Sequence, residues 1–423
     1  MKRTNIIRLV PDKRQNELLM VIGDRVSRLW NAANFLCRQN LVKGKAVPSY
    51  AKLCSILKTD ENYRFLPSDI AQEVLKKLSK AWTSYFRLVK LQKSGKPMDR
   101  PGLPRYRKDR KTGKRPFDFI PIKSLRTYSL SGGIFSITLP SDLRNGRLCI
   151  GCKGILRYRG ILKTCELKYD RARTRWYAHI TVEISKPRRK QKPVKYASGD
   201  IGAKRAIAVV IEGSKIAHVF SARELWKDYK YWTRRIAREQ SRLSAQGLKT
   251  SRQLKRLYRM RKLRVEHGLE ALARKVALIL KREKVTHFAV GYPKGCREEM
   301  QFGKNNALVH NFWSFDRVLN ILEKHCTRRD IELKRVDEQA TSDVCNMCGK
   351  EVKRPVRSVV VCPEHGRYHA DVNAAINILL KNTPGYGDGV KATPAWVTHE
   401  WNKHLWLPRA RSLRYVSQVL QAV

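Results

Sequence analysis

The chain has 423 residues, of which 89 are Lys or Arg and 36 are Asp or Glu, so its formal net charge is +53. A compact protein with this much positive charge repels itself unless a polyanion neutralises it, which points to a nucleic acid as the partner. The sequence has no apolar run of about 18 residues and starts without an apolar signal core, so neither a membrane-spanning nor a secreted protein is expected. Its cysteines are scattered, which favours a reducing compartment over a disulfide scaffold.

The N-terminal region predicts a strand followed by helices. Residues 3–10 form a short strand pattern that Pro11 closes. Apolar side chains then recur at helical spacing over residues 12–42 and again over 68–93. Such stripes are typical of helices that bury one face, so we expect a small helical domain at 12–93.

A basic segment follows the helices and interleaves aromatic with cationic side chains. It covers residues 94–117 and includes the run Pro-Arg-Tyr-Arg-Lys-Asp-Arg-Lys at 104–111. A solvated charge run is the ordinary alternative, but the net charge of the chain favours a contact with nucleic acid. The residues predicted to make this contact are Arg105, Tyr106, Arg107, Lys108 and Arg110.

From residue 118 to 186 the apolar pattern changes to a period of two, which predicts antiparallel strands in a small barrel-like β domain. Cys149 and Cys152 have the spacing of a metal-binding pair. No second pair follows them at finger distance, so we interpret them as strand residues. The basic segment 187–193 predicts a linker to the next domain.

After this linker, strands alternate with helices, which predicts an α/β core. The expected elements are a strand at 196–200 with a glycine turn and a second strand, a helical hairpin at 223–283 broken near Gly247, a buried strand at 286–290, a helix at 311–329 and a strand at 331–336.

Four metal-ligand residues near the end of the chain form the strongest motif. Cys345 and Cys348 are followed, after a gap, by Cys362 and His365, and this set suits tetrahedral zinc. Four protein ligands fill the coordination sphere, so the zinc is expected to be structural. A redox role for the first cysteine pair would leave the second pair unexplained.

Two aspartates stand where metal-dependent phosphodiester cleavage would need them. Asp200 ends the first strand of the predicted α/β core, and Asp371 opens a helix directly after the zinc motif. Two-metal hydrolysis uses carboxylates from separate elements that converge on cations about 4 Å apart. Taken singly, Asp200 is an ordinary turn residue and Asp371 an ordinary helix cap. Their joint placement around the zinc motif favours a catalytic site.

Together these motifs resemble those of TnpB, the RNA-guided nuclease family of insertion-sequence transposons, and of the compact type V CRISPR effectors. The resemblance covers the chain to about residue 381. It rests on Gly-Asp200-Ile-Gly, on His310-Asn-Phe-Trp313-Ser-Phe, on the block 336–349 and on the block 362–377. The length favours TnpB over a miniature CRISPR effector, although neighbouring DNA would be needed to separate the two.

The resemblance implies a multidomain α+β fold with an RNase H-like α/β nuclease domain, called RuvC. The implied domains are a helical recognition domain at 12–93, an oligonucleotide-binding-like β-barrel (the wedge) at 1–11 and 94–190, RuvC at 194–340 and 366–381, a zinc-binding insertion at 341–365 and a C-terminal tail at 382–423. Trp396, Trp401 and Trp406 in this tail favour docking or base stacking, with an unstructured end as the alternative.

One position departs from the family pattern. The strand that usually ends in Glu-Asp-Leu reads Phe288-Ala-Val-Gly291-Tyr here, so the second catalytic glutamate is absent from its usual place. We expect Glu338 to replace it, because the strand at 331–336 should lie beside the strand that ends at Gly291. Asp337 is the fallback, although strand alternation turns one of the two away from the site. Glu298 and Glu299 are weaker candidates, and Glu338 as a mere cap of the next segment is the ordinary alternative.

By resemblance, the chain is expected to be an RNA-guided DNA endonuclease that binds a noncoding guide RNA and target double-stranded DNA. The implied cofactors are structural zinc and two magnesium ions on Asp200, Glu338 and Asp371, with Arg367 close enough in sequence to steady the scissile phosphate. The alternatives are a nuclease-dead RNA-guided repressor and a nuclease or transposase that acts without RNA. We expect a monomer with its RNA, without a membrane partner, in the cytoplasm of a prokaryotic cell near the nucleoid.

Overall fold

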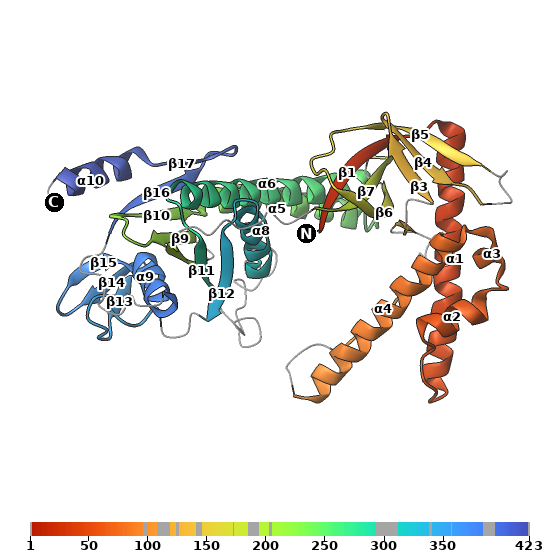
Figure 1. The fold of residues 1–423 in the computed structure, drawn as a ribbon, viewed down its shortest axis with the longest axis horizontal. Helices are drawn as coiled ribbons and strands as arrows, with labels where there is room; N and C mark the ends of the chain where they lie inside the picture. Colours follow the sequence, from red (N-terminus) through yellow and green to blue (C-terminus); the bar gives the residue numbers. More distant parts are fainter. Residues whose placement is uncertain are drawn as a thin grey trace. The chain divides into compact units, whose positions relative to one another are not determined.

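The computed structural model describes residues 2–95, 100–107, 119–123, 127–140, 146–171, 173–184, 194–202, 205–292, 312–337, 341–356, 358–383 and 394–421. The chain forms two compact units, Met1–Lys186 and Pro187–Val423, which we call the amino-terminal and the carboxy-terminal unit (Figure 1). Among the described helices, none combines the length and the apolar character needed to cross a membrane.

The amino-terminal unit contains a helical part. Its helices are α1 (Lys13–Val42), α2 (Tyr50–Leu57), α3 (Glu61–Phe65) and α4 (Ser68–Lys93). Asp12 starts α1 with a capping box, because its side chain accepts the N–H of Gln15 while the Gln15 side chain accepts the N–H of Asp12. The predicted apolar stripes are the buried faces of α1 and α4, and the Trp82 indole donates to Asn34 between these helices at 3.1 Å. The predicted helices are confirmed.

The same unit contains a curled antiparallel sheet. Its strands β1 (Lys2–Val10), β2 (Ile120–Ile122), β3 (Tyr128–Ser131), β4 (Ile134–Thr138), β5 (Arg147–Lys153), β6 (Ile161–Asp170) and β7 (Arg175–Glu183) have the order β2-β6-β7-β1-β5-β4-β3. The Tyr128 hydroxyl on β3 donates to the carbonyl of Lys163 on β6 at 3.0 Å, so the edges curl toward each other. Within the described residues no ladder joins β2 to β3, which makes the expected barrel a half-barrel. Cys149 and Cys152 lie on β5, as predicted.

The carboxy-terminal unit is built on a mixed sheet. Its strands β8 (Tyr196–Asp200), β9 (Arg205–Ile211), β10 (Ile216–Ser221), β11 (His287–Tyr292), β12 (Glu332–Asp337), β16 (Ala395–Trp401) and β17 (Trp406–Pro408) have the order β12-β11-β8-β9-β10-β16-β17. Strands β8, β10, β11, β12 and β16 run in one direction, and β9 and β17 run in the other. The carboxyl ends of the first group therefore share one edge of the sheet, which we call the carboxyl edge.

Helices cover both faces of this sheet (Figure 1). The helices are α5 (Arg223–Ala245), α6 (Arg252–Arg282) and α8 (Phe315–Thr327) on one face and α9 (Ala370–Asn382) on the other. Alternate residues of β9 divide between the faces: Ile207 and Val209 join the core under α6 and α8, whereas Ala208 and Val210 join the core under α9. The predicted α/β core and the helical hairpin with its break near Gly247 are confirmed.

The last strands correct the prediction of a separate tail at 382–423. Strand β16 pairs in parallel with β10, β17 returns beside it, and α10 (Ala410–Gln421) packs against β16. Trp401 and Trp406 are 4% and 2% exposed, and the Trp406 indole donates to the carbonyl of Gly268 at 3.0 Å. These tryptophans belong to the core of the sheet, so the base-stacking role predicted for them is wrong. Trp396 is half-buried and lies against His369.

Candidate active site and metal-binding knuckle

Three neighbouring parallel strands bring the candidate catalytic positions to the carboxyl edge. The register pairs Gly199 of β8 with Val290 of β11, and Gly291 of β11 with Val336 of β12. Asp200, the last residue of β8, is therefore level with Gly291, one strand spacing of about 4.8 Å away. The sequence-based expectation that β12 lies beside the strand ending near Gly291 is confirmed.

Helix α9 brings the second aspartate to the same edge. The Ser198 hydroxyl on β8 donates to the carbonyl of Ala375, which places that turn of α9 over β8. Asp371, one turn earlier in α9, contacts Arg205, which begins β9 beyond the end of β8. Helix α9 therefore descends from the carboxyl edge, antiparallel to β8. Because side chains two apart on a strand share a face, Asp200 faces the α9 side with Ser198.

The charge of Asp371 is balanced by an arginine that sequence reasoning missed. Nη1 of Arg205 lies 2.7 Å from Oδ2 of Asp371, and the two side chains are 31% and 28% exposed. His369, the cap of α9, lies 4.0 Å from the same oxygen. Burial lowers the pKa of His369 to about 4, an effect that Arg205 strengthens and Asp371 opposes. His369 is therefore neutral at pH 7, and the positive charge beside Asp371 comes from Arg205.

Gly291, the residue before the end of β11, stands level with Asp200 and has no side chain that could bind a metal. Glu338, predicted to supply the missing group, lies outside the described residues, as do Glu298 and Glu299. Their proposed roles stay predictions.

Asp337, the fallback candidate, is described and faces away from the two aspartates. Side chains alternate along β12: Arg335 donates to Asn320 of α8 at 2.7 Å, whereas Val336 packs against Ile378 of α9. Asp337 lies two residues after Arg335 and is exposed on the α8 side. The site between β8 and α9 is on the opposite face, which disfavours Asp337 as a ligand there.

The four ligand-type side chains of the zinc motif converge. One ligand atom from each of Cys345, Cys348, Cys362 and His365 lies within 4.8 Å of all the others. Sγ of Cys362 is 3.6 Å from Sγ of Cys348 and 3.5 Å from Nδ1 of His365. Tetrahedral zinc bonds of about 2.3 Å to sulfur and 2.0 Å to nitrogen require separations of about 3.8 Å and 3.5 Å. The set therefore fits zinc.

The thiol chemistry of the knuckle also suits a metal. Burial by itself raises the pKa of Cys362, but hydrogen bonds from His365 and from the backbone N–H groups of residues 364 and 365 lower it to about 6. The thiolate, which is the form that binds metal, is thus favoured at Cys362 at neutral pH. At Cys348, a hydrogen bond from the Lys350 backbone is outweighed by burial and the neighbouring thiols, which raise the pKa to about 11.

The knuckle has a small sheet of its own. Its strands are β13 (Lys353–Val356), β14 (Val359–Cys362) and β15 (Gly366–His369). The Cys345 turn closes with two backbone bonds, and Gly349 within it has a φ of 70°, where glycine is favoured. Strand β15 pairs along β14 and runs directly into α9. The knuckle thus extends to His369, beyond the predicted end at residue 365.

Two buried asparagines fasten the knuckle to α9. Asn373 is 0% exposed; it accepts a backbone N–H of the knuckle at 2.9 Å and donates to the carbonyl of Val344 at 2.8 Å. Asn377 donates to the carbonyls of Thr341 and Val344 at 2.8 and 2.9 Å. Because Asp371 lies on the first turn of the same helix, its position depends on a folded knuckle. The sequence showed these asparagines near Asp371 but held no signal for their partners.

Part of the basic segment has a structural role. Arg107 is 8% exposed, and its guanidinium lies over the rings of Trp30 and Phe119 at 4.2 and 5.4 Å. Its backbone N–H donates to Asn31 of α1 at 2.7 Å. Cation–π packing holds the charged group of Arg107 inside the fold, which disfavours the predicted contact of this residue with nucleic acid.

The other predicted contact residues have different environments. Arg105 is exposed, and Tyr106 is 39% exposed with the Arg38 guanidinium 4.5 Å above its ring. Arg367 is exposed on β15. Lys108 and Arg110 lie outside the described residues.

Comparison with known proteins identifies the family of this chain. The profile of a family described as a probable transposase matches residues 179–297, and that of the Cas12f1-like TNB domain matches residues 315–378. A TnpB-like protein, ORF457 of Acidianus two-tailed virus, is 30% identical over 416 residues, covering 90% of this chain and 86% of its own length. The chain belongs to the TnpB family. In this TnpB-family chain, the second profile spans α8, β12, the knuckle and most of α9.

The fold of this TnpB-family protein also matches a solved structure. The cryo-EM structure of a Cas12f1–sgRNA–target DNA complex superposes with a TM-score of 0.61, covering 87% of this chain and 83% of that chain at 17% identity. This likeness concerns the fold alone, and it confirms the predicted combination of helical and sheet parts.

We expect the purified protein to carry about one zinc ion per chain and Cys348→Ser to lose it, because one of four ligands is removed. Metal analysis by mass spectrometry measures this. The matched control is Cys149→Ser, which changes the other Cys-x-x-Cys sequence, on β5. Zinc retained in Cys348→Ser, or lost equally in Cys149→Ser, would contradict the assignment.

Proposed function

We propose that this TnpB-family protein is an RNA-guided endonuclease that cuts target DNA at the carboxyl edge of its carboxy-terminal unit. The placement of Asp200 and Asp371 on one face and at one edge of the sheet carries the proposal. The Cas12f1 structure of the same fold was solved with sgRNA and target DNA, which supports these two classes of partner. A guide RNA and its heteroduplex also supply the phosphate that a net charge of +53 requires.

Asp200 and Asp371 are the proposed ligands of two magnesium ions. Carboxylate oxygens are the ligands that magnesium prefers, and two bound ions supply an activated water and stabilise the leaving oxygen of a phosphodiester. Arg205 holds the carboxylate of Asp371 in place by an ion pair. Because its guanidinium is still 31% exposed, Arg205 can also donate to a phosphate oxygen of the substrate.

Glu338 is the proposed third ligand. Val336 faces α9 and Asp337 faces α8, and we expect the same alternation to bring the Glu338 side chain to the side of Asp200 and Asp371. Gly291 leaves space on the strand between them. The carboxylate lost from the end of β11 is thus replaced from the neighbouring strand.

Substituting the two neighbouring acids tests this replacement. Glu338→Gln is expected to slow cleavage more than about 100-fold. Losing a metal ligand should lower activity more than losing a residue that supports a ligand, which lowers it by roughly 10–100-fold. Asp337→Asn is the matched control and should retain most activity. A time course of target cleavage gives both rates. Equal losses, or a larger loss with Asp337→Asn, would overturn the assignment of Glu338.

A nuclease-dead RNA-guided repressor is the second candidate function, and Gly291 at the usual glutamate position is the observation that favours it. To test this, the protein is expressed together with its native flanking DNA, and the RNA that copurifies is sequenced. Matched target DNA and magnesium are then added to the complex. Cleavage at the matched site supports the endonuclease. Tight, guide-dependent binding without cleavage would instead identify a repressor, and cleavage without RNA would identify an unguided nuclease.

A further inference from the structure

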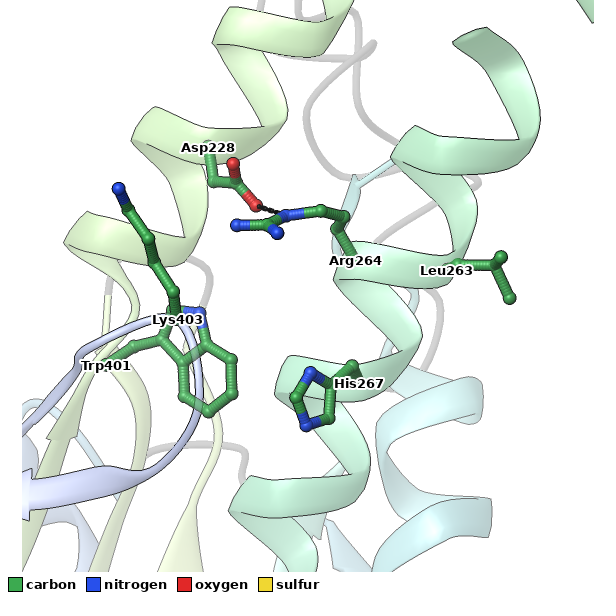
Figure 2. A pocket seen from close by; sticks show the side chains of 6 residues that line it. All are labelled: Asp228, Leu263, Arg264, His267, Trp401 and Lys403. Carbon is green, nitrogen blue, oxygen red and sulfur yellow. Dashed lines mark hydrogen bonds and ion pairs between the residues drawn. The ribbon is translucent and has the colours of Figure 1, made fainter. Parts of the chain in front are cut away.

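A pocket lies between the helical hairpin and the last two strands of the carboxy-terminal unit. Its volume is about 280 Å³, and it is lined by Asp228, Leu263, Arg264, His267, Trp401 and Lys403. Figure 2 shows Arg264 reaching across to Asp228, Trp401 and Lys403 coming from the opposite wall, and Leu263 pointing away. One wall therefore comes from the α5–α6 hairpin and the other from the end of β16 and the β16–β17 turn, which lie far from the hairpin in the sequence.

The pocket offers hydrogen-bond donors that the fold does not use. Nε of Arg264 donates to Asp228 at 2.7 Å, but in the described part of the chain its two terminal nitrogens have no partner. Lys403 is exposed, and no described acidic group pairs with its ammonium. The His267 ring is exposed and meets Trp401 edge-on at 5.4 Å. Asp228 pairs with Arg264 only through Nε, so the terminal nitrogens of Arg264 and the ammonium of Lys403 suit a phosphate, and the exposed His267 ring suits the sugar or base of a nucleotide.

Two hydrogen bonds close the turn that carries Lys403. The side chain of Asn402 accepts the backbone N–H groups of His404 and Leu405 at 3.0 and 2.7 Å. Lys403 has a φ of 75°, a conformation that costs a lysine free energy and that glycine adopts freely.

The pocket lies at the same edge of the sheet as the candidate active site. Strands β8 and β16 run in the same direction with β9 and β10 between them, so Trp401 and Asp200 both end their strands at the carboxyl edge. The register places Asp200 level with Thr398, about 14 Å away across three strand spacings, and Trp401 lies three residues, or about 10 Å, further along β16. Trp401 faces α6 and Asp200 faces α9, so a strand that joins the two sites must cross this edge of the sheet.

We propose that this pocket binds a phosphodiester and the attached nucleoside of a single nucleic-acid strand. The terminal nitrogens of Arg264 and the ammonium of Lys403 contact the phosphate, while the exposed His267 ring, with the buried Trp401 behind it, lies against the sugar or base. The inference rests on the proposed function only in requiring a nucleic acid as partner. The strand is either part of the guide RNA or part of the target DNA, which share this chemistry.

Photo-crosslinking of the full chain with its copurified RNA and matched target tests the pocket. One set of complexes carries 5-iodouracil along the RNA and a second set carries it along the DNA, and crosslinked peptides are identified by mass spectrometry. We expect crosslinks to His267 or to the 401–405 turn from one of the two strands. The strand that reacts identifies the source of the phosphate.

Lys403→Gly removes the cation while suiting the backbone, so its fold should be retained, as thermal melting will show. Its crosslinking yield at the pocket should fall about threefold or more, the order expected for one phosphate contact. The control Lys215→Gln, in the β9–β10 turn at the opposite edge, should leave the yield unchanged. Crosslinks elsewhere without any at the pocket, or an unchanged yield in Lys403→Gly, would overturn the proposal. A complex that crosslinks at the pocket but does not cut the target would contradict the proposed cleavage activity and support the pocket.

Discussion

Replacing Trp406 by alanine is expected to lower the free energy of unfolding of the carboxy-terminal unit by about 3–5 kcal/mol. Trp406 is 2% exposed and lies in the core formed by α6, α8 and the sheet, so the substitution leaves a cavity. It also removes the donor to the carbonyl of Gly268. Domains are stable by only about 5–15 kcal/mol, so the unit should become marginal. Denaturant unfolding followed by fluorescence measures the change.

Leu407→Ala is the matched control, because the next residue on the same strand is 46% exposed. It should change stability by no more than about 0.5 kcal/mol, as exposed positions usually do. If both substitutions cost the same, or if Trp406→Ala costs nothing, the last strands do not belong to the core of this unit.

Replacing Asp371 by asparagine is expected to lower the cleavage rate more than about 100-fold. Losing a metal ligand should reduce activity more than losing a residue that supports a ligand, which reduces activity by roughly 10–100-fold. Stability should change little. The ion pair that Asp371 forms with Arg205 is partly exposed, and such pairs contribute about 0–1 kcal/mol. Guide and target binding should therefore survive, and electrophoretic mobility shifts measure this beside the cleavage rate.

Asp316→Asn provides the comparison, since Asp316 is an acid of α8 that is 48% exposed and pairs with Arg335. Its cleavage rate should equal that of the unchanged protein. Full activity in Asp371→Asn, or a loss of guide binding as large as the loss of cleavage, would contradict the assignment of Asp371 to the active site.

Features of the fold that depend on local spacing were predictable from the sequence. The apolar stripes of α1 and α4 specified their helices because burial of one face repeats every 3.6 residues. The four knuckle residues were predictable because tetrahedral zinc limits their spacing. The family resemblance predicted that β12 lies beside β11. In the structure the pairing of β11 with β12 and with β8 places Gly291 level with Asp200.

Features that depend on distant partners were not predictable. Strand β16 has an alternating buried pattern, but nothing local identifies β10 as its partner. Arg107 stands in a basic run that is typical of nucleic-acid contacts, and only the fold places Trp30 beneath its guanidinium. Arg205 and Asn373 are likewise ordinary residues in their own strand and helix. Their roles arise from contacts with Asp371 and the knuckle.

The most direct measurement of the central claim rewrites the guide. The copurified RNA is sequenced, its target-matching segment is replaced, and the complex is incubated with magnesium and two DNA molecules, one matching each guide. RNA-guided cleavage in the carboxy-terminal unit predicts that the cut moves to the newly matched DNA and disappears in Asp200→Ala. Cutting that ignores the guide, or that persists in Asp200→Ala, would contradict the account.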